Sequence, residues 1–193
     1  MIWSGDNDVA FANGDTGTGP YPADPTSYVQ EAAEDLVGDL LFLKNAGARH
    51  IIVAGLAYDF PMGNSVDATN KRALKLAYTQ ELFQNLDMIL GTGFAYKAGI
   101  DQVRMAIYNS PARHGFTNIG TQPGEMACSQ PSGISTAWAL LCSSDPAAPS
   151  TYSGSTPQTD LFADDQHLGT AGQKLMANFL FRLIVPLTGL PIP

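Results

Sequence analysis

An aspartate and a histidine, Asp164 and His167, stand three residues apart near the C-terminal end of the 193-residue chain. Histidine accepts a proton near neutral pH, and a carboxylate bonded to its second ring nitrogen fixes the tautomer and stabilises the imidazolium. The pair therefore indicates a general base with its orienting carboxylate. The alternative is that Asp164 or Asp165 caps the following helix, with His167 exposed to solvent.

A second polar group, Gly5-Asp6-Asn7-Asp8, follows a short apolar start. We expect the apolar residues to be the end of a strand and the polar residues to open a loop, where α/β sheets place ligand-facing groups. In that position the side-chain amide of Asn7 could donate a hydrogen bond to a developing oxyanion. The alternative is an Asx-type turn without a chemical role.

Composition limits the class of protein. The length fits one α/β domain over residues 1–193, and the formal net charge of -8, with no basic stripe, argues against a nucleic acid partner. Charged residues make up only 15% of the chain, which is typical of an exported protein with long polar loops. In such a protein the two cysteines, Cys128 and Cys142, are expected to form a disulfide rather than two free thiols.

The sequence shows neither the pattern of a signal peptide nor that of a membrane-spanning helix. Residues 1–5 have neither the basic start nor the apolar stretch of a signal peptide. No apolar run reaches the roughly 20 residues of a membrane-spanning helix, so we expect no membrane span.

The elements that must position the polar groups alternate between helix and strand. Asp24 predicts the cap of a helix that ends near residue 45, and apolar spacing predicts two further helices. The predicted helices cover residues 25–45, about 65–90 and about 170–184; the predicted strands cover 50–55 and 102–108; and residues 11–26, 55–61 and most of 111–160 are predicted as loops. This order predicts a parallel sheet with helices on both faces. Two strands are too few, so we expect the chain to begin after its sheet has started.

Together, the two polar groups resemble the third and fifth sequence blocks of the SGNH (GDSL-type) hydrolases. Residues 46–56 are similar to the helix-to-strand passage of the autotransporter-type bacterial esterases in that family. Cys128 and Cys142, followed by residues 161–172, are similar to the same group's late segment. The resemblance covers nearly the whole chain, with one departure at Leu168-Gly169, where the family usually has Pro-Thr.

The resemblance implies a flavodoxin-like three-layer α/β/α sandwich, truncated at its N-terminal strands. It implies a secreted or cell-surface bacterial enzyme that hydrolyses short-to-medium acyl or aromatic esters without a cofactor. By residue, it implies that His167 is the general base, Asp164 its orienter and Asn7 an oxyanion donor. Gly5 would permit close approach of the backbone.

The family's nucleophilic serine block has no counterpart in this chain. Ser4 is the nearest substitute, although neighbouring strands lie about 4.8 Å apart, which would displace it from the family position. The alternatives are that His167 activates water directly with help from Asn7, or that the fold is a non-catalytic remnant that binds acyl or glycan ligands. A third alternative is that this chain is incomplete and that another chain supplies the missing strands.

An exposed sheet edge would further favour a homodimer. Two histidines and two tryptophans receive weaker interpretations. We expect His50 and His114 to be solvated rather than catalytic. Trp3 and Trp138 could line a cleft, or else belong to the core or a dimer contact.

Overall fold

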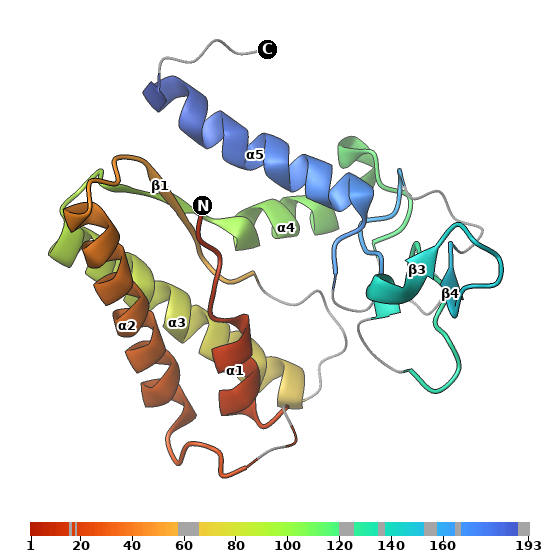
Figure 1. Cartoon of the computed structure of the whole chain (residues 1–193), viewed down its shortest axis with the longest axis horizontal. Coiled ribbons are helices and arrows are strands. Elements are labelled where there is room, and N and C mark those ends of the chain that lie inside the picture. The colour runs from red at the N-terminus through yellow and green to blue at the C-terminus, as the bar shows by residue number, and fades with distance from the viewer. Residues whose placement is uncertain are drawn as a thin grey trace. The chain divides into compact units, whose positions relative to one another are not determined.

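The computed structural model describes residues 1–15, 17, 19–57, 66–119, 126–134, 138–152, 158–164 and 167–188, without the side chains of 66–68, 138, 184 and 186–188. The chain divides into two compact units, Met1–Arg104 and Met105–Pro193. Figure 1 shows the elements of both units.

The first unit contains most of the regular structure. Its elements are the helices α1 (Asp6–Asn13), α2 (Pro25–Asn45) and α3 (Val66–Leu90) and the strands β1 (Ile51–Ala54) and β2 (Ala95–Ala98). Helix α4 (Ile100–Asn109) follows and contains the boundary between the units. The predicted helices over 25–45 and about 65–90 are confirmed.

Helices α2 and α3 lie side by side and form the core of this unit (Figure 1). Helix α2 begins as predicted, because the Asp24 carboxylate accepts the backbone N–H groups of Thr26 (3.0 Å) and Ser27 (3.1 Å). The core consists of apolar residues at helical spacing on both helices, together with β1: Val29, Ala33, Val37, Leu40, Ile51, Val53, Leu74, Tyr78, Leu82, Leu86 and Leu90.

The strands pair in parallel, as the α/β class requires. β1 pairs with β2 in the register Ile51↔Ala95, and all four β1 residues are buried. On the other edge of β1, Ile2 donates its backbone N–H to the Ile52 carbonyl (2.8 Å) and accepts the Ala54 N–H (2.9 Å). Of the strand end predicted for the first residues, the structure therefore has one isolated bridge, at Ile2.

Predictions of local structure are wrong at residues 102–108, in part of 11–26 and in the loop expected at Gly5–Asp8, where α1 begins. Residues 102–108 form part of α4 rather than a strand, because Ile100, Val103 and Ile107 recur at helical spacing and bury or half-bury one face. The strand at this place is the more polar β2, which the sequence did not indicate. The loop predicted over 11–26 is helical up to Asn13, at the end of α1. Part of the predicted loop 55–61, residues 58–61, lies outside the described residues.

The second unit contains the end of α4, the short 3₁₀ helices η1 (Pro111–His114) and η2 (Trp138–Leu141), and α5 (Thr170–Thr188). Two short parallel strands, β3 (Cys142–Ser143) and β4 (Ser150–Thr151), pair with each other. The predicted disulfide between Cys128 and Cys142 is confirmed, and so is the last helix. The fold is therefore mixed helix and strand with small parallel sheets, as in the general α/β class.

Within the part of the chain that the structure describes, no helix combines the length and apolar character needed to cross a bilayer.

Candidate functional site

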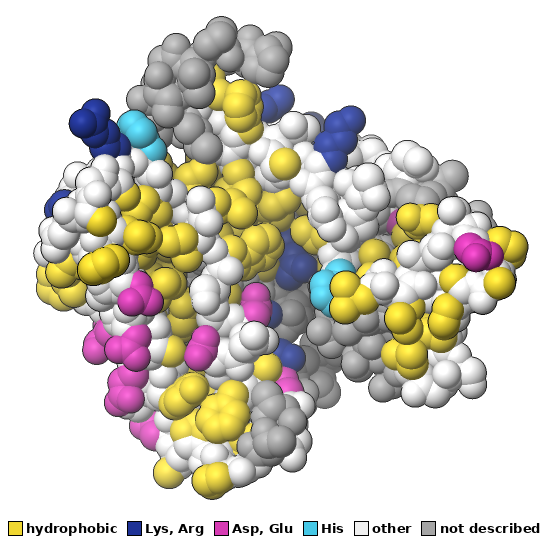
Figure 2. All heavy atoms as spheres, in the orientation of Figure 1, with side chains coloured by type: hydrophobic (Ala, Val, Ile, Leu, Met, Phe, Trp, Pro, Cys, Tyr) yellow, Lys and Arg dark blue, Asp and Glu magenta, His cyan; other side chains and the backbone are white. Residues whose placement is uncertain are grey.

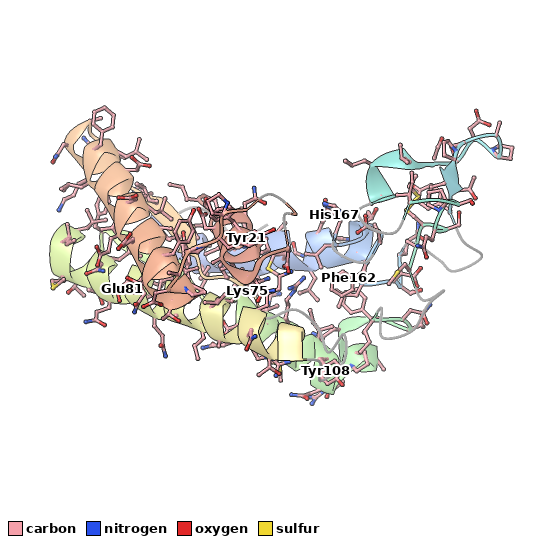
Figure 3. All side chains as sticks on the ribbon, turned by 90° about the horizontal axis from the view of Figure 1, so that it is seen from below. Tyr21, Lys75, Glu81, Tyr108, Phe162 and His167 are labelled. Carbon is pink, nitrogen blue, oxygen red and sulfur yellow. A yellow bond between two sulfur atoms is a disulfide. The ribbon has the colours of Figure 1, made fainter. Side chains whose placement is uncertain are left out.

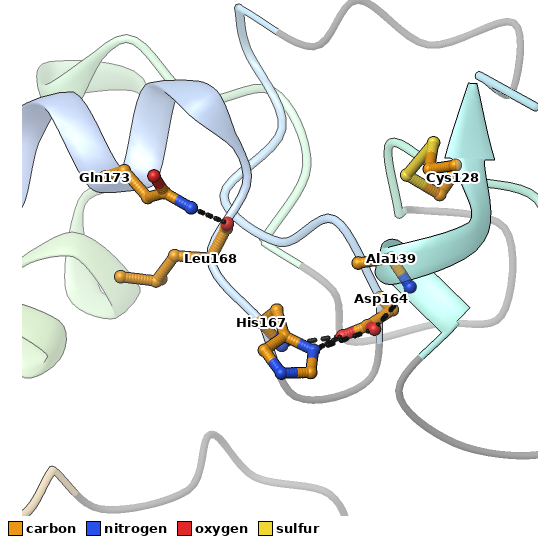
Figure 4. A network of polar contacts seen from close by, with 7 residues as sticks. Cys128, Ala139, Asp164, His167, Leu168 and Gln173 are labelled. Atoms are coloured by element: carbon orange, nitrogen blue, oxygen red, sulfur yellow. Dashed lines mark hydrogen bonds and ion pairs between the residues drawn. A yellow bond between two sulfur atoms is a disulfide. The ribbon is translucent and has the colours of Figure 1, made fainter.

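Asp164 and His167 lie on a tight antiparallel turn of the second unit, shown in Figure 4. Phe162 and Leu168 form an antiparallel bridge. The Ala163 N–H donates to the His167 carbonyl (2.8 Å), and the Gly169 N–H donates to the Leu161 carbonyl (2.8 Å). The backbone on both sides of the turn is therefore fixed by hydrogen bonds.

Close packing against the start of α5 fixes the C-terminal side of the same turn. A Cβ atom placed on Gly172 would lie only 2.5 Å from the Leu161 carbonyl oxygen, so a side chain there would push the helix away. Gln173 adds two contacts: its side-chain amide donates to the Leu168 carbonyl (3.1 Å; Figure 4), and its backbone N–H donates to the Gly169 carbonyl (2.9 Å). The first turn of α5 thus holds the residues that follow His167.

The Asp164 carboxylate contacts the His167 ring as the spacing predicts. Nδ1 of His167 lies 3.0 Å from Oδ1 and 2.9 Å from Oδ2 of Asp164. Asp164 Oδ1 also accepts the His167 backbone N–H (2.6 Å), and Oδ2 accepts the Ala139 backbone N–H from η2 (2.7 Å). The carboxylate is thus held from two sides. The carboxylate binds the turn and η2, and α5 begins only at Thr170, which disfavours Asp164 as the cap of that helix. Asp165, the other candidate for this cap, lies outside the described residues.

Burial separates the two members of the pair. The Asp164 side chain is 0% exposed, whereas the His167 side chain is 47% exposed. The carboxylate contact assigns the ring proton to Nδ1, which leaves the lone pair on Nε2, directed away from Asp164 (Figure 4). An Nε2 acceptor on a half-exposed ring, backed by a buried carboxylate, is the arrangement that a general base requires.

The other three predicted site residues, Ser4, Gly5 and Asn7, belong to the first unit. The prediction that Asn7 lies on a loop is wrong. Asn7 is exposed in the first turn of α1, which begins directly after Gly5. Ser4 is also exposed and precedes the helix. The structure therefore brings Asp164 and His167 together in one unit, and keeps Ser4, Gly5 and Asn7 within a few residues of one another in the other unit.

Gly5 meets two constraints that only glycine satisfies easily. It caps α1 with a left-handed backbone (φ 111°), and a Cβ atom at this position would lie 2.4 Å from Cζ of Tyr78. In the structure, the group that approaches the Gly5 backbone closely is the Tyr78 ring on α3. The ring is almost fully buried and anchors the start of α1 in the core.

Ion pairs on the same side of α3 also hold α1. The nearly buried Lys75 (4% exposed) contacts Asp6 at 2.8 Å, and Figure 3 shows Lys75 on the face of α3 turned toward α1. Lys71 contacts Asp15 at 2.7 Å. Partial burial of the Asp15 carboxyl opposes ionisation, but the hydrogen bonds from Lys71 and Asn13 and the charges of Lys71 and Lys75 outweigh it, so its pKa is lowered. These α3 contacts were not predictable from the sequence.

Tyr78 makes the stability of the first unit sensitive to alkaline pH. Burial, together with the charges of Asp8 and Asp6, raises the pKa of the Tyr78 phenol above its ordinary value near 10. The folded state therefore holds the phenol proton more tightly than the unfolded state. This contribution to stability is fully present below about pH 10 and is lost as the pH rises further.

The unfolding free energy of the parent should fall between about pH 8 and about pH 11, and we expect a smaller fall in Tyr78→Phe. Urea denaturation at both pH values measures this difference. Tyr152→Phe, at a half-exposed tyrosine, is the matched control and should change the difference less. Equal pH dependence in the parent and in Tyr78→Phe would contradict the prediction.

His50 and His114 are both exposed, as expected. Trp3 packs against the core of the first unit, which favours the core interpretation over a cleft. The side chain of Trp138 lies outside the described residues.

Acidic side chains gather over α2 on the face shown in Figure 2. The exposed members on this helix are Glu31, Glu34, Asp35 and Asp39. A surface of this kind repels polyanions.

Comparison of the chain with protein-family models finds no match, and a search of curated proteins finds no relative. The resemblance to SGNH hydrolases therefore stays a prediction from the sequence motifs.

Proposed function

We propose that the protein is a carboxylic ester hydrolase of the SGNH type, with His167 as general base and Asp164 as its orienting carboxylate. The observation that carries this proposal is the buried Asp164 carboxylate at 2.9 Å from Nδ1 of a half-exposed His167. The proposed substrates are short-to-medium acyl or aromatic esters.

In this mechanism Nε2 of His167 removes a proton from the attacking oxygen as that oxygen forms a bond to the ester carbonyl carbon. Asp164 stabilises the imidazolium, which then protonates the departing alcohol oxygen. The attacking oxygen belongs either to water or to Ser4, the serine nearest to the motif that resembles the family. If it belongs to Ser4, the acyl group stays on the serine as an ester, and a water deprotonated by His167 then attacks that ester, releases the acid and restores the serine hydroxyl. The resemblance assigns oxyanion stabilisation to Asn7 and close backbone approach to Gly5.

The finer features of the proposal are a flavodoxin-like three-layer sandwich and export to the bacterial surface or beyond. The disulfide supports export, because disulfides persist in oxidising compartments. We also propose a homodimer through an exposed edge of the small parallel sheet. A monomer in light scattering at micromolar concentration would contradict this feature.

The test is the hydrolysis rate of a short-chain p-nitrophenyl ester by the parent protein, Ser4→Ala, Asn7→Ala and His167→Ala. We expect His167→Ala to lower the rate by about 10²–10⁴-fold, the usual contribution of general base catalysis. His50→Ala, which removes another exposed histidine, is the matched control and should retain the parent rate.

The serine variant distinguishes the two nucleophiles. Loss in both Ser4→Ala and His167→Ala indicates a serine nucleophile, and loss in His167→Ala alone indicates activated water. Equal rates for the parent and His167→Ala would contradict the proposal and favour the alternative of a non-catalytic module that binds acyl or glycan ligands.

A further inference from the structure

The Cys128–Cys142 disulfide joins two segments that both bind the backbone or side chain around Asp164. On one side, η2 runs directly into Cys142, and the Ala139 N–H of η2 donates to Asp164 Oδ2 (2.7 Å). On the other side, the Cys128 N–H donates to the carbonyl of Ala163, the residue before Asp164 (3.0 Å). Figure 4 shows the disulfide and η2 on the side of Asp164 opposite His167.

The Asp164 carboxylate depends on the Ala139 N–H because its side chain is fully buried. A buried carboxylate needs hydrogen bonds in place of water, and a lost donor favours rearrangement of the side chain. If Asp164 rotates to regain a partner, its contact with Nδ1 of His167 is weakened. The orientation of the histidine is therefore coupled to the position of η2.

The disulfide is the covalent constraint on η2 in this unit. The strands that follow η2 have only two residues each, with Cys142 opposite Ser150 and Ser143 opposite Thr151. The segment after Cys128 has further bonds, since the Ser129 N–H donates to the Thr151 carbonyl (2.7 Å) and Ser150 Oγ donates to the Ser129 carbonyl (2.7 Å). Loss of the cross-link should therefore loosen η2 while these bonds keep the rest of the region folded.

We propose that the Cys128–Cys142 disulfide positions Asp164 against His167 through η2, so that its reduction uncouples the pair. Reduction by a dithiol transfers two electrons and two protons, breaks the S–S bond, leaves two cysteine thiols and converts the dithiol to its own disulfide. Cys128, Cys142 and Ala139 are thus positioning residues. The consequence for ester hydrolysis rests on the proposed function, whereas the consequence for the His167 ring does not.

The test uses NMR of the His167 imidazole in the full chain, because ring nitrogen shifts and the Nδ1–H proton signal report the carboxylate contact without a substrate. We expect a hydrogen-bonded Nδ1–H signal in the oxidised protein. We expect its loss or broadening after dithiothreitol and in the Cys128→Ala/Cys142→Ala double variant. In a hydrolysing protein, kcat should fall by about tenfold or more, a part of the contribution of base catalysis. KM should change less than kcat.

Ala139→Pro tests the same link with the disulfide intact, since proline lacks the N–H and is tolerated in the first turn of a helix. It should reproduce the NMR change of the reduced protein, whereas Ala139→Gly, which keeps the N–H, should not. If circular dichroism shows that the reduced protein is unfolded, the comparison of Ala139→Pro with Ala139→Gly tests the proposal instead. An unchanged Nδ1–H signal in Ala139→Pro, or in a folded reduced protein, would overturn the proposal. A normal NMR response without hydrolysis in any form would overturn the proposed function alone.

Discussion

Asp164→Ala should lower the unfolding free energy by about 2–5 kcal/mol, because it leaves two backbone donors without their acceptor at a buried site. The donors are the N–H groups of His167 (2.6 Å) and Ala139 (2.7 Å), both of which bind the carboxylate. Urea denaturation of the oxidised protein measures the change.

Two matched variants show whether this loss of stability comes from the buried hydrogen bonds of Asp164. One removes another carboxylate, and the other removes the histidine of the pair. Asp145→Ala removes an exposed carboxylate that also accepts a backbone N–H, from Ala147 at 2.9 Å, and should cost about 1 kcal/mol or less. His167→Ala removes one donor to the buried carboxylate but keeps both backbone donors, so it should cost less than Asp164→Ala, even though we propose that it abolishes base catalysis. A change below about 0.5 kcal/mol for Asp164→Ala would contradict the arrangement described here.

The long helices could be predicted because several local signals agree along each of them. Helix α2 combines a capping Asp24, proline at its first position and a buried apolar stripe, and all three are found in the structure. The segment over 102–108 lacks such agreement. A short run of mixed apolar residues fits either period, and burial of Ile100 and Ile107 on one helical face decides for α4.

The candidate site was predictable only where it is local in sequence. Asp164 and His167 lie three residues apart, so one turn brings them together whatever the rest of the chain does. The Ala139 N–H that supports Asp164 comes from a residue 25 positions away, and a backbone group carries no signature in the sequence. Lys75 and Tyr78, which hold the start of α1, could not be predicted either, because their partners are set by the packing of α3.

Gly5→Ala should destabilise the protein by about 2–6 kcal/mol, because two penalties act at one position. A positive φ of 111° strains an L-residue by roughly 1–3 kcal/mol. Overpacking adds about 1–3 kcal/mol, since the new Cβ would lie 2.4 Å from Tyr78 Cζ. Chemical denaturation monitored by circular dichroism measures the total.

Gly47→Ala is the matched control, because Gly47 also has a positive φ (97°) but no atom within 4 Å of the added Cβ. It should cost only about 1–2 kcal/mol, so the difference between the two variants isolates the contact with Tyr78. A second check is Gly5→Ala combined with Tyr78→Leu. The smaller side chain makes room for the Cβ, so the combined cost should be below the sum of the single costs by about 1 kcal/mol. Equal costs for Gly5→Ala and Gly47→Ala would contradict the contact.

The same variant separates two roles for Gly5. If the remaining folded Gly5→Ala protein hydrolyses esters at the parent rate, the glycine serves the packing of α1 on Tyr78 and not the approach of a substrate to the backbone. If the rate per folded molecule falls while the circular dichroism spectrum is unchanged, the start of α1 takes part in the reaction. The second result would support Asn7, two residues further along the same turn, as the oxyanion donor that the sequence resemblance implies.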